Sequence, residues 1–402
     1  MTVIDAVRGG LAEVRAEVDA TLDRFLAEKA RTAPDPCLPP LVEVLKEFVA
    51  GGKRLRPLFC HCGFVAAGGS PDDGAVAWAG AALEMFHTFA LVHDDIMDRS
   101  ELRRGRPTVH RALADRFAGR DQDGGQAAER MPSRVQGDGQ AAERLAGPDQ
   151  DGGQAAEGFA GRDHDDGSAA ERFGANLAIL AGDLCFTWTD EMLDRADIDQ
   201  RRWRAVRSLL HTMRTELIAG QLLDLGGDPR SPADPVRSAW RTIRLKTARY
   251  TVELPLRIGV ALAGGDAALM RVCGAYGRPV GEAYQLRDDL LGMFGDPKVT
   301  GKPDLDDLRG GKPTVLMALA WQQATPGQRE VISARYGDPE LDEEGAARLR
   351  DVVVATGAAA RVERLITIRA DRALGTLRSS SMSPAAKAPL AELVAHATRR
   401  TR

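Results

Sequence analysis

The sequence predicts an all-α protein, a large single-domain helical bundle around a central cavity. Four long segments, at residues 74–98, 174–196, 201–225 and 268–294, are apolar over a broad face with the period of a helix. Runs of strict apolar–polar alternation bounded by Asn-Gly or Asp-Gly turns, which would indicate strands, are missing from the sequence. Helices this long and this apolar must pack against one another, so we expect a bundle.

The start of the chain and its prolines refine this picture. The first thirty residues carry acids and bases throughout, so they predict an amphipathic helix and lack the apolar centre of a signal peptide. We find no run of about 18 or more apolar residues, so we expect no transmembrane helix and no stable membrane insertion. Pro255 and Pro279 lie inside helical patterns and should kink or break them.

Cysteine usage and charge exclude other classes of protein. Five cysteines, an odd number without repeated spacing, argue against a disulfide framework. Cys60 and Cys62 could indicate a metal site, but no second Cys/His pair completes a tetrahedral set, so we interpret both as buried thiols. A reduced, cytoplasmic protein is therefore expected. The net charge is −4 and the basic residues are scattered or tied to motifs, which argues against a nucleic-acid partner.

A repeat with a period of fourteen residues occupies residues 118–172. QAAER stands at 126–130 and 140–144, QAAEG at 154–158 and SAAER at 168–172. Eleven glycines, few apolar residues and a net charge of −6 leave too little apolar surface to offset the loss of chain entropy. We expect a disordered insertion in a tolerant surface loop, and a partner-binding segment is the alternative.

The first candidate site lies at the end of the helix predicted for residues 74–98. Asp94 and Asp98 are four residues apart, so their carboxylates project from one helix face, with Asp95 between them. Clustered acids at the end of an apolar helix are unfavourable unless a cation lies beside them. Mg²⁺ is the natural occupant, because it prefers hard oxygen ligands and leaves room for phosphate oxygens. A solvated acidic helix end is the alternative.

A second acidic pair, Asp288 and Asp289, follows Gln285 deep in another apolar helix. One buried acidic cluster could arise by chance. Two clusters, each towards the end of a long apolar helix, indicate two walls of one metal-lined mouth, where cations would join the carboxylates to a diphosphate.

Basic residues recur beside both acidic motifs. Gly51-Gly52-Lys53-Arg54-Leu55-Arg56-Pro57 opens a predicted helix, and Arg103-Arg104-Gly105-Arg106 follows the first acidic motif. Further along stand Lys246-Thr247, Lys302 and Lys312. Arginine makes bidentate contacts to phosphate and lysine supplies a point charge, so this recurrence predicts diphosphate binding.

Seven motifs then follow one another in a recognisable order. They are GGKRLRP, LVHDDIMDRSELRRGRPTVH, AILAGD, GQLLD, KT, YQLRDDLLGMFGD and TGKPDLDDLRGGKPT. The chain resembles the trans-isoprenyl diphosphate synthases, the polyprenyl synthetase family, and within it the actinobacterial geranylgeranyl and farnesyl diphosphate synthases. The resemblance implies a fold of the isoprenoid synthase type over residues 1–117 and 173–402, a homodimer, and three Mg²⁺ ions per active site.

The resemblance also implies roles for individual residues. The implied metal ligands are Asp94, Asp98 and Asp288, with Asp95 and Asp289 beside them. The residues that hold the allylic diphosphate would be Arg103, Lys246 and Lys302. Isopentenyl diphosphate would be held by Lys53, Arg56, His87 and Arg104. The cavity near the metals would be lined by Gln221, Asp224 and Gln285, and its mouth closed by Asp307 and Lys312. The substrate-binding residues would also include Thr247, Gln285 and Lys312. One departure is Gly292, which stands where the family often has the last acid of the second motif.

The implied reaction joins isopentenyl diphosphate head to tail to an allylic diphosphate. Preorganised Mg²⁺, Lys and Arg charges would stabilise the departing diphosphate, and the apolar helices would keep water from the allylic cation. A terpene cyclase is one alternative, but it would not need the second diphosphate pocket of Lys53, Arg56 and Arg104. An inactive regulatory subunit is another, but such subunits usually lose the acidic motifs.

Product length should be set along the helix that carries Asp94. Phe89 and Phe86 precede it by five and eight residues, on roughly one stripe with Leu83. The family commonly uses an aromatic residue at the Phe89 position to stop elongation, whereas Ala90 beside it is small. This pattern favours geranylgeranyl diphosphate as the product, with farnesyl diphosphate as the alternative.

Overall fold

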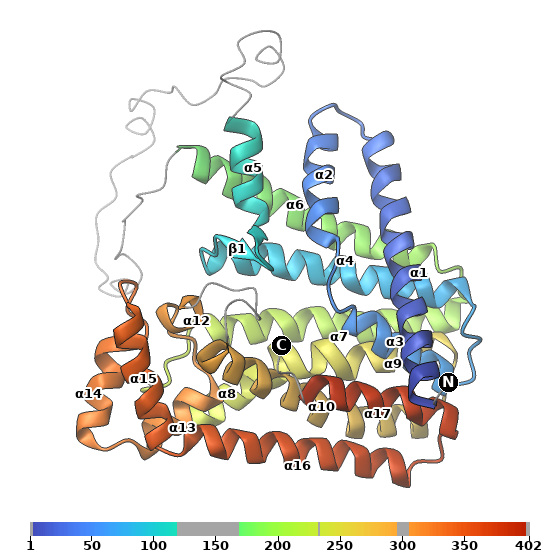
Figure 1. The fold of residues 1–402 in the computed structure, drawn as a ribbon. Coiled ribbons are helices and arrows are strands. Elements are labelled where there is room, and N and C mark those ends of the chain that lie inside the picture. Colours follow the sequence, from blue (N-terminus) through green and yellow to red (C-terminus); the bar gives the residue numbers. More distant parts are fainter. Residues whose placement is uncertain (1–2, 119–168, 232–233, 296–304, 399–402) are drawn as a thin grey trace, which may run out of the picture.

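The structure is a computed structural model that describes residues 3–118, 169–231, 234–295 and 305–398, and it is almost entirely helical (Figure 1). The elements of the first half are α1 (Val3–Arg31), α2 (Leu38–Val49), α3 (Leu55–Ala66), α4 (Gly74–Met97), β1 (Leu102–Arg103), β2 (Arg106–Pro107), α5 (Val109–Ala118), α6 (Ala169–Asp194) and α7 (Gln200–Leu225). The second half contains α8 (Pro235–Thr242), η3 (Ile243–Glu253), α9 (Leu254–Leu262), α10 (Ala267–Phe294), α12 (Asp306–Arg309), α13 (Val315–Gln323), α14 (Pro326–Arg335), α15 (Glu343–Ala355), α16 (Ala358–Ser379) and α17 (Pro384–Thr398). The expectation of an all-α bundle is confirmed.

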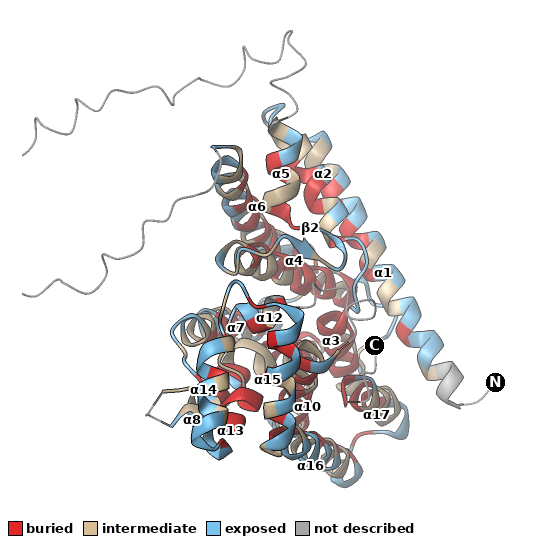
Figure 2. Cartoon of the chain, turned by 60° about the vertical axis from the view of Figure 1, so that its left-hand side comes forward, coloured by how far each residue is buried: buried red, intermediate tan, exposed pale blue. Residues whose placement is uncertain are grey.

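Long helices build the bundle in packed pairs. Helix α4 packs along α6, α3 along α9, and α10 lies between η3 and α16. Buried residues are frequent on α3, α4 and α10, whereas α14, α15 and α16 carry many exposed residues (Figure 2). The four long helices that the apolar pattern predicts appear as α4, α6, α7 and α10, and α1 is the predicted N-terminal helix.

Helix α4 is long and predominantly apolar. By length and hydropathy alone, its 24 residues could span a membrane. This finding corrects the expectation that no segment of the sequence has these properties. In the described structure 67% of its most apolar window is buried inside the bundle, with Ala79, Ala82 and Phe86 fully covered. Burial by neighbouring helices accounts for this composition, because a helix that is apolar on all sides also suits the core of a large protein.

The two prolines behave differently. Pro255 stands in the first turn of α9, directly after the π-helical segment η3, so the helical geometry changes there as predicted. Pro279 lies inside α10, which continues past it, so of the predicted kink or break the break does not occur. Packing of α10 against η3 on one side and α16 on the other holds the helix together through the missing backbone hydrogen bond.

Two glycines allow η3 to lie deep between its neighbours. A Cβ atom at Gly220 of α7 would come 2.4 Å from the Lys246 backbone nitrogen, and one at Gly281 of α10 would come 2.5 Å from Ala248. Any larger residue at these positions would push η3 outward. The glycines therefore fix how far Lys246 and its neighbours project towards the space between α4 and α10.

Cys60 and Cys62 are buried in α3, and burial raises the pKa of both thiols to about 12, as expected for inert core residues. The repeat lies almost wholly in residues 119–168, outside the described residues. The short antiparallel pair β1–β2, in which Leu102 pairs with Pro107, is not foreseen by the sequence pattern.

Candidate active site

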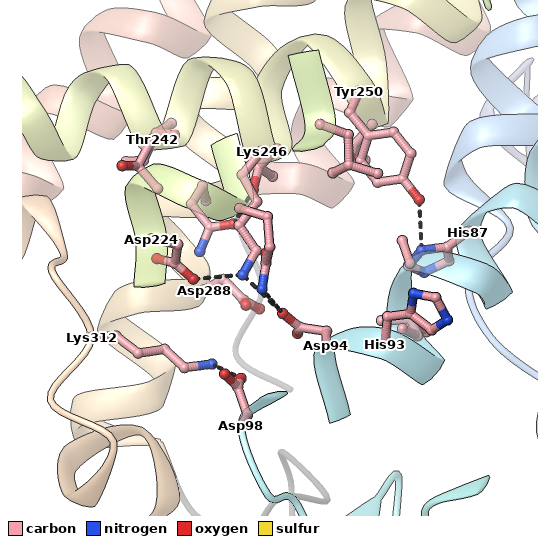
Figure 3. Close-up of a pocket in the computed structure, with 18 of the residues that line it drawn as sticks. His87, His93, Asp94, Asp98, Asp224, Thr242, Lys246, Tyr250, Asp288 and Lys312 are labelled. Carbon is pink, nitrogen blue, oxygen red and sulfur yellow. Dashed lines mark hydrogen bonds and ion pairs between the residues drawn. The ribbon is translucent and has the colours of Figure 1, made fainter. Parts of the chain in front are cut away.

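A cavity of about 920 Å³ opens between α3, α4, α7, η3 and α10. Acidic and basic side chains surround its mouth, whereas Phe89, Ala90 and Leu217 line deeper positions. Figure 3 shows the mouth, with Asp94 and Asp98 at the end of α4 facing Asp224 and Asp288 from the other helices. The predicted convergence of the two acidic motifs on one mouth is therefore present in the structure.

Helix α4 presents Asp94 and Asp98 to this mouth and turns Asp95 away from it. Asp94 Oδ1 accepts hydrogen bonds from Gln221 Nε2 at 2.9 Å and from Lys246 Nζ at 3.0 Å. Asp98 ends the helix and accepts from Lys312 Nζ at 2.8 Å. Burial alone would raise the pKa of Asp94, but the charges of Lys246, Lys312 and nearby Arg103 outweigh it and keep that pKa below its usual value.

Asp95 is fully buried and forms a bidentate pair with Arg103. Arg103 Nε and Nη2 lie 2.8 and 2.5 Å from Asp95 Oδ1. Burial raises the pKa of Asp95 despite this pairing. Asp95 therefore acts on the mouth indirectly, because it fixes the guanidinium of Arg103, whose Nη2 also lies 3.8 Å from Asp94.

The opposite wall comes from α10. Asp289 Oδ1 accepts from Gln285 Nε2 at 2.8 Å, and Gln285 Oε1 accepts from Thr247 Oγ1 at 2.8 Å. The other carboxylate oxygen of Asp289 is buried and has no hydrogen-bond partner among the described residues. Burial, with nearby carboxylates that include Asp288, raises the pKa of Asp289 to about 8. A buried carboxyl group with a raised pKa and an oxygen without a hydrogen-bond partner is what a divalent cation would stabilise in its ionised form.

At Gly292, where the sequence lacks the last acid of the second motif, another carboxylate lies against α10. A Cβ atom at this position would lie 2.5 Å from Asp307 Oδ2. The carboxylate of Asp307 thus occupies the side of α10 where the side chain of the missing acid would begin.

Two lysines bridge the acids across the mouth. Lys246 Nζ lies 3.0 Å from Asp94 and 2.5 Å from Asp224, so it joins α4 to α7 through η3 (Figure 3). Lys312 Nζ lies 2.8 Å from Asp98 and 3.7 Å from Asp307. Burial works against both charges, yet the surrounding carboxylates raise the pKa of each lysine. Both lysines are therefore charged groups beside the space where a diphosphate would lie.

A separate basic cluster lies on the side of the mouth formed by the start of α3. The guanidinium of Arg104 lies over Gly52, where a Cβ atom would be 3.0 Å from Nη1, and Gly52 has a φ of +105° that suits glycine. Arg56 stacks on Tyr250, with its guanidinium carbon 4.1 Å from the ring centre, and donates to Thr251 Oγ1 at 2.9 Å. Burial and the neighbouring arginines lower the pKa of Arg104.

This cluster is suited to an anion. Arg56 Nε is buried without a hydrogen-bond partner among the described residues, so the cluster retains donors for a ligand. Lys53 also lines the cavity here. His87 Nδ1 lies 3.0 Å from the Tyr250 hydroxyl, and burial, reinforced by the arginines, moves the pKa of His87 far below its usual value.

Most sequence-predicted residues thus meet at one cavity, with some exceptions. Lys302 lies outside the described residues, so its role stays a prediction. Phe89 lines the cavity, but Phe86 is fully buried behind it and does not reach the cavity surface. The chain-length role predicted for Phe86 is therefore at most indirect.

Around the cavity, Tyr250 and Phe186 have no role predicted from the sequence, and Arg54 belongs to the predicted basic motif without a role of its own. Tyr250 stands one helical turn after Lys246 and lines the cavity next to His87. The Lys-Thr motif could have pointed to it through the i, i+4 spacing. Arg54 lines the cavity and is buried. Phe186 packs edge-on against Phe89, with ring centres 5.1 Å apart, and no sequence motif marks it.

Comparisons with known proteins point to one family. The family model described as polyprenyl synthetase matches residues 39–121 and 165–353. The geranylfarnesyl diphosphate synthase of Aeropyrum pernix is 29% identical over 380 residues, which is 93% of this chain and 96% of that protein. The (2E,6E)-farnesyl diphosphate synthase of Mycobacterium tuberculosis is 29% identical over 279 residues, covering 69% of this chain and 58% of that protein.

Solved structures are similar over nearly the whole chain. The geranylgeranyl pyrophosphate synthase from Corynebacterium glutamicum, complexed with isoprenyl diphosphate and magnesium, superposes with a TM-score of 0.81 and 34% identity. The similarity covers 98% of this chain and 99% of that one.

Proposed function

Because the chain belongs to the polyprenyl synthetase family and is a prenyltransferase of the trans-isoprenyl diphosphate synthase type, we propose that geranylgeranyl diphosphate is its main product. The reaction would join isopentenyl diphosphate to allylic diphosphates, with Mg²⁺ as cofactor. The observation that carries the proposed reaction is the presence of two separate ionic regions at the cavity, one for each diphosphate. Facing carboxylates with Lys246 and Lys312 form one, and Arg56, Arg104 and His87 form the other.

The residues present fit Mg²⁺. No three His, Cys, Asp or Glu side chains in the described part of the chain converge closely enough to hold a metal by themselves. Asp94 and Asp98 instead face Asp288 across the mouth, so phosphate oxygens and water would complete the coordination. When bound, Mg²⁺ would neutralise the charge that develops on the departing diphosphate. The predicted number of three ions is part of the proposal.

The chain's own groups orient the two substrates. Lys246, Lys312 and Arg103 would bind the allylic diphosphate at the acidic mouth, where their fixed charges stabilise the leaving group. Lys53, Arg56 and Arg104 would hold isopentenyl diphosphate alongside it. The allylic C–O bond breaks with its electron pair going to the diphosphate, and the isopentenyl double bond forms the new C–C bond. The proton that leaves the isopentenyl unit would go to the departing diphosphate.

Phe89 supports the twenty-carbon product. It stands five residues before Asp94 and lines the cavity beside the small Ala90, so one aromatic ring limits the space for the chain. Products of different length are named for similar proteins, from farnesyl to geranylfarnesyl diphosphate, so the length must be measured. A homodimer and a cytoplasmic location complete the proposal, to be tested by light scattering and by cell fractionation.

The test is turnover of the purified chain. Radiolabelled isopentenyl diphosphate is supplied with dimethylallyl, geranyl or farnesyl diphosphate and Mg²⁺, and the dephosphorylated alcohols are separated by chromatography. Geranylgeraniol as the main alcohol supports the proposal. A main product of fifteen or twenty-five carbons would refute the product assignment, and no condensation with any primer would refute the activity.

A further inference from the structure

The cavity floor is backed by an aromatic layer and then by a charged layer. Phe89 lines the cavity and stacks on Phe86, with ring centres 5.5 Å apart and planes at 23°. Phe186 of α6 meets both rings edge-on, at 5.1 and 6.0 Å. The guanidinium carbon of Arg214 then lies 4.3 Å from the centre of the Phe186 ring and 5.7 Å from that of Phe86.

The positions along the helices place Arg214 at the deep end of the cavity. On α7, Arg214 precedes Leu217, which lines the cavity, and stands seven residues before Gln221 at the mouth. Seven residues correspond to about 10 Å along a helix, whereas the five residues from Asp94 to Phe89 correspond to about 7.5 Å. Arg214 therefore lies further from the acids than Phe89 does, behind the aromatic rings.

Arg214 is charged, mostly covered and incompletely hydrogen-bonded. Its side chain is 11% exposed, and its two terminal nitrogens lie 3.0 and 3.2 Å from the carboxylate of Asp190, which is 52% exposed. Its Nε is buried and has no hydrogen-bond partner among the described residues. The aromatic face of Phe186 partly compensates for this, because a cation above a ring is attracted to its π electrons.

We propose that Arg214 is a second residue that determines product length, acting below Phe89. This inference rests on the proposed elongation of a prenyl chain into this cavity. A chain that passes Phe89 would have to displace Phe186 or Phe86 from the guanidinium and put hydrocarbon against a buried charge. That arrangement is unfavourable, since the guanidinium would exchange its aromatic contact for alkyl groups and gain no hydrogen bond. On the side away from the rings, Arg214 pairs with the half-exposed Asp190.

The test compares three variants by the length of their longest major product. Arg214→Met alone should leave the wild-type product, because Phe89 still stops the chain first. Phe89→Ala should lengthen the product by one five-carbon unit, limited by the arginine. Phe89→Ala combined with Arg214→Met should add at least one more unit, because methionine is apolar, flexible and long enough to cover Phe186.

A charge control separates polarity from bulk. Phe89→Ala with Arg214→Lys keeps a cation and should keep the length of Phe89→Ala alone. If the methionine variant does not fold, as judged by circular dichroism and gel filtration, Arg214→Gln in the same background replaces it and should also lengthen the product. The inference is overturned if the neutral and charged variants give the same products as Phe89→Ala. Failure of the proposed function would show separately, in the wild-type protein, as no condensation or as a main product other than geranylgeranyl diphosphate.

Discussion

Asp307 Oδ2 lies against Gly292, 2.5 Å from where a Cβ atom of that glycine would stand. The carboxylate of Asp307, in the first turn of α12, therefore lies where the side chain of a last acid in the second motif would begin. Asp307 also lies 3.7 Å from Lys312, which binds Asp98, so one ionic chain joins the two walls of the mouth.

Gly292→Ala should therefore lower activity without unfolding the protein. The new methyl group would displace Asp307 and with it Lys312, and small displacements of positioning groups can reduce turnover by about a hundredfold. We expect a loss of kcat/KM of about tenfold or more. The melting temperature should stay unchanged or rise, because alanine has a higher helix propensity than glycine. Gly274→Ala is the matched control on α10, because its Cβ atom would meet Glu253 at an ordinary 3.7 Å. Equal kinetics for the two variants would contradict the role of Gly292.

Replacing Asp94 or Asp98 by alanine should nearly abolish turnover. Both carboxylates face the mouth, where Asp94 accepts hydrogen bonds from Gln221 and Lys246 and Asp98 accepts one from Lys312. Loss of a metal ligand should raise the activation free energy by several kcal/mol, which is about a thousandfold or more in rate. Steady-state kinetics at saturating Mg²⁺ measure this. Glu344→Ala, at an exposed ion pair with Arg348 on α15, is the control, and near-normal rates for Asp94→Ala would defeat the metal assignment.

Deletion of residues 119–168 should leave the fold and most of the activity intact. The ends of this segment are already joined, because Arg111 of α5 forms ion pairs with Glu101 and with Glu171 of α6. The rings of Phe117 and Phe173 also lie 6.1 Å apart. A short Gly/Ser join therefore needs no rearrangement, and loop length changes closure entropy only logarithmically.

We expect kcat/KM of the deletion variant within about tenfold of wild type. The comparison is a second deletion that also removes Glu171 and Phe173. It should melt at a lower temperature because it removes the ion pair and the ring contact between α5 and α6. A folded first variant without turnover would show that the segment takes part in catalysis.

The pH dependence of stability should contain a contribution from His87. Burial holds its pKa far below the usual value near 6.5, so the folded state keeps the ring neutral. The unfolded state takes up the proton as the pH falls below about 6.5, so this contribution is fully present above that pH and is lost on acidification towards the folded pKa. The groups that face His87 are Tyr250 at 3.0 Å and the positive charges of Arg54, Arg56, Arg103 and Arg104.

Urea unfolding between pH 7.5 and 5 checks this prediction on wild type and His87→Gln. The wild-type free energy of unfolding should fall more steeply with decreasing pH than that of the variant. His61 and His110, whose pKa values burial also lowers, contribute equally to both proteins and cancel in the difference. Parallel pH profiles would contradict a neutral His87 in the folded state.

The sequence was most informative where chemistry follows helical spacing. Asp94 and Asp98, one turn apart on α4, could be assigned to one face, and both turn to the mouth. The layer of Phe186 and Arg214 could not be predicted, because it brings α6 and α7 against α4 and depends on how these helices pack. The depth of Lys246 depends in the same way on Gly220 and Gly281, whose small size matters only once η3 lies between them.

Arg54 provides a last prediction, because it connects the basic loop to three parts of the bundle. Its Nε lies 2.6 Å from Asp19 of α1, its Nη1 lies 3.1 Å from Glu84 of α4, and its Nη2 donates to the Val49 carbonyl at 2.7 Å. Arg54 is 4% exposed and adopts a left-handed backbone conformation with a φ of 48°. These contacts hold the turn from which Lys53 and Arg56 reach the cavity.

Arg54→Met should destabilise the protein and raise the KM for isopentenyl diphosphate. The substitution leaves the buried carboxylate of Glu84 without its closest partner, which should cost about 3 kcal/mol, as for other broken buried pairs. Arg54→Met with Glu84→Gln removes that unpaired charge and should recover most of the stability, as measured by urea unfolding. The KM should stay raised in the double variant, because neither new side chain ties the turn to Asp19 and Val49. Arg8→Met, at an exposed ion pair with Glu392, is the control and should change neither quantity. If the double variant regained a normal KM, Arg54 would stabilise the fold without positioning the loop.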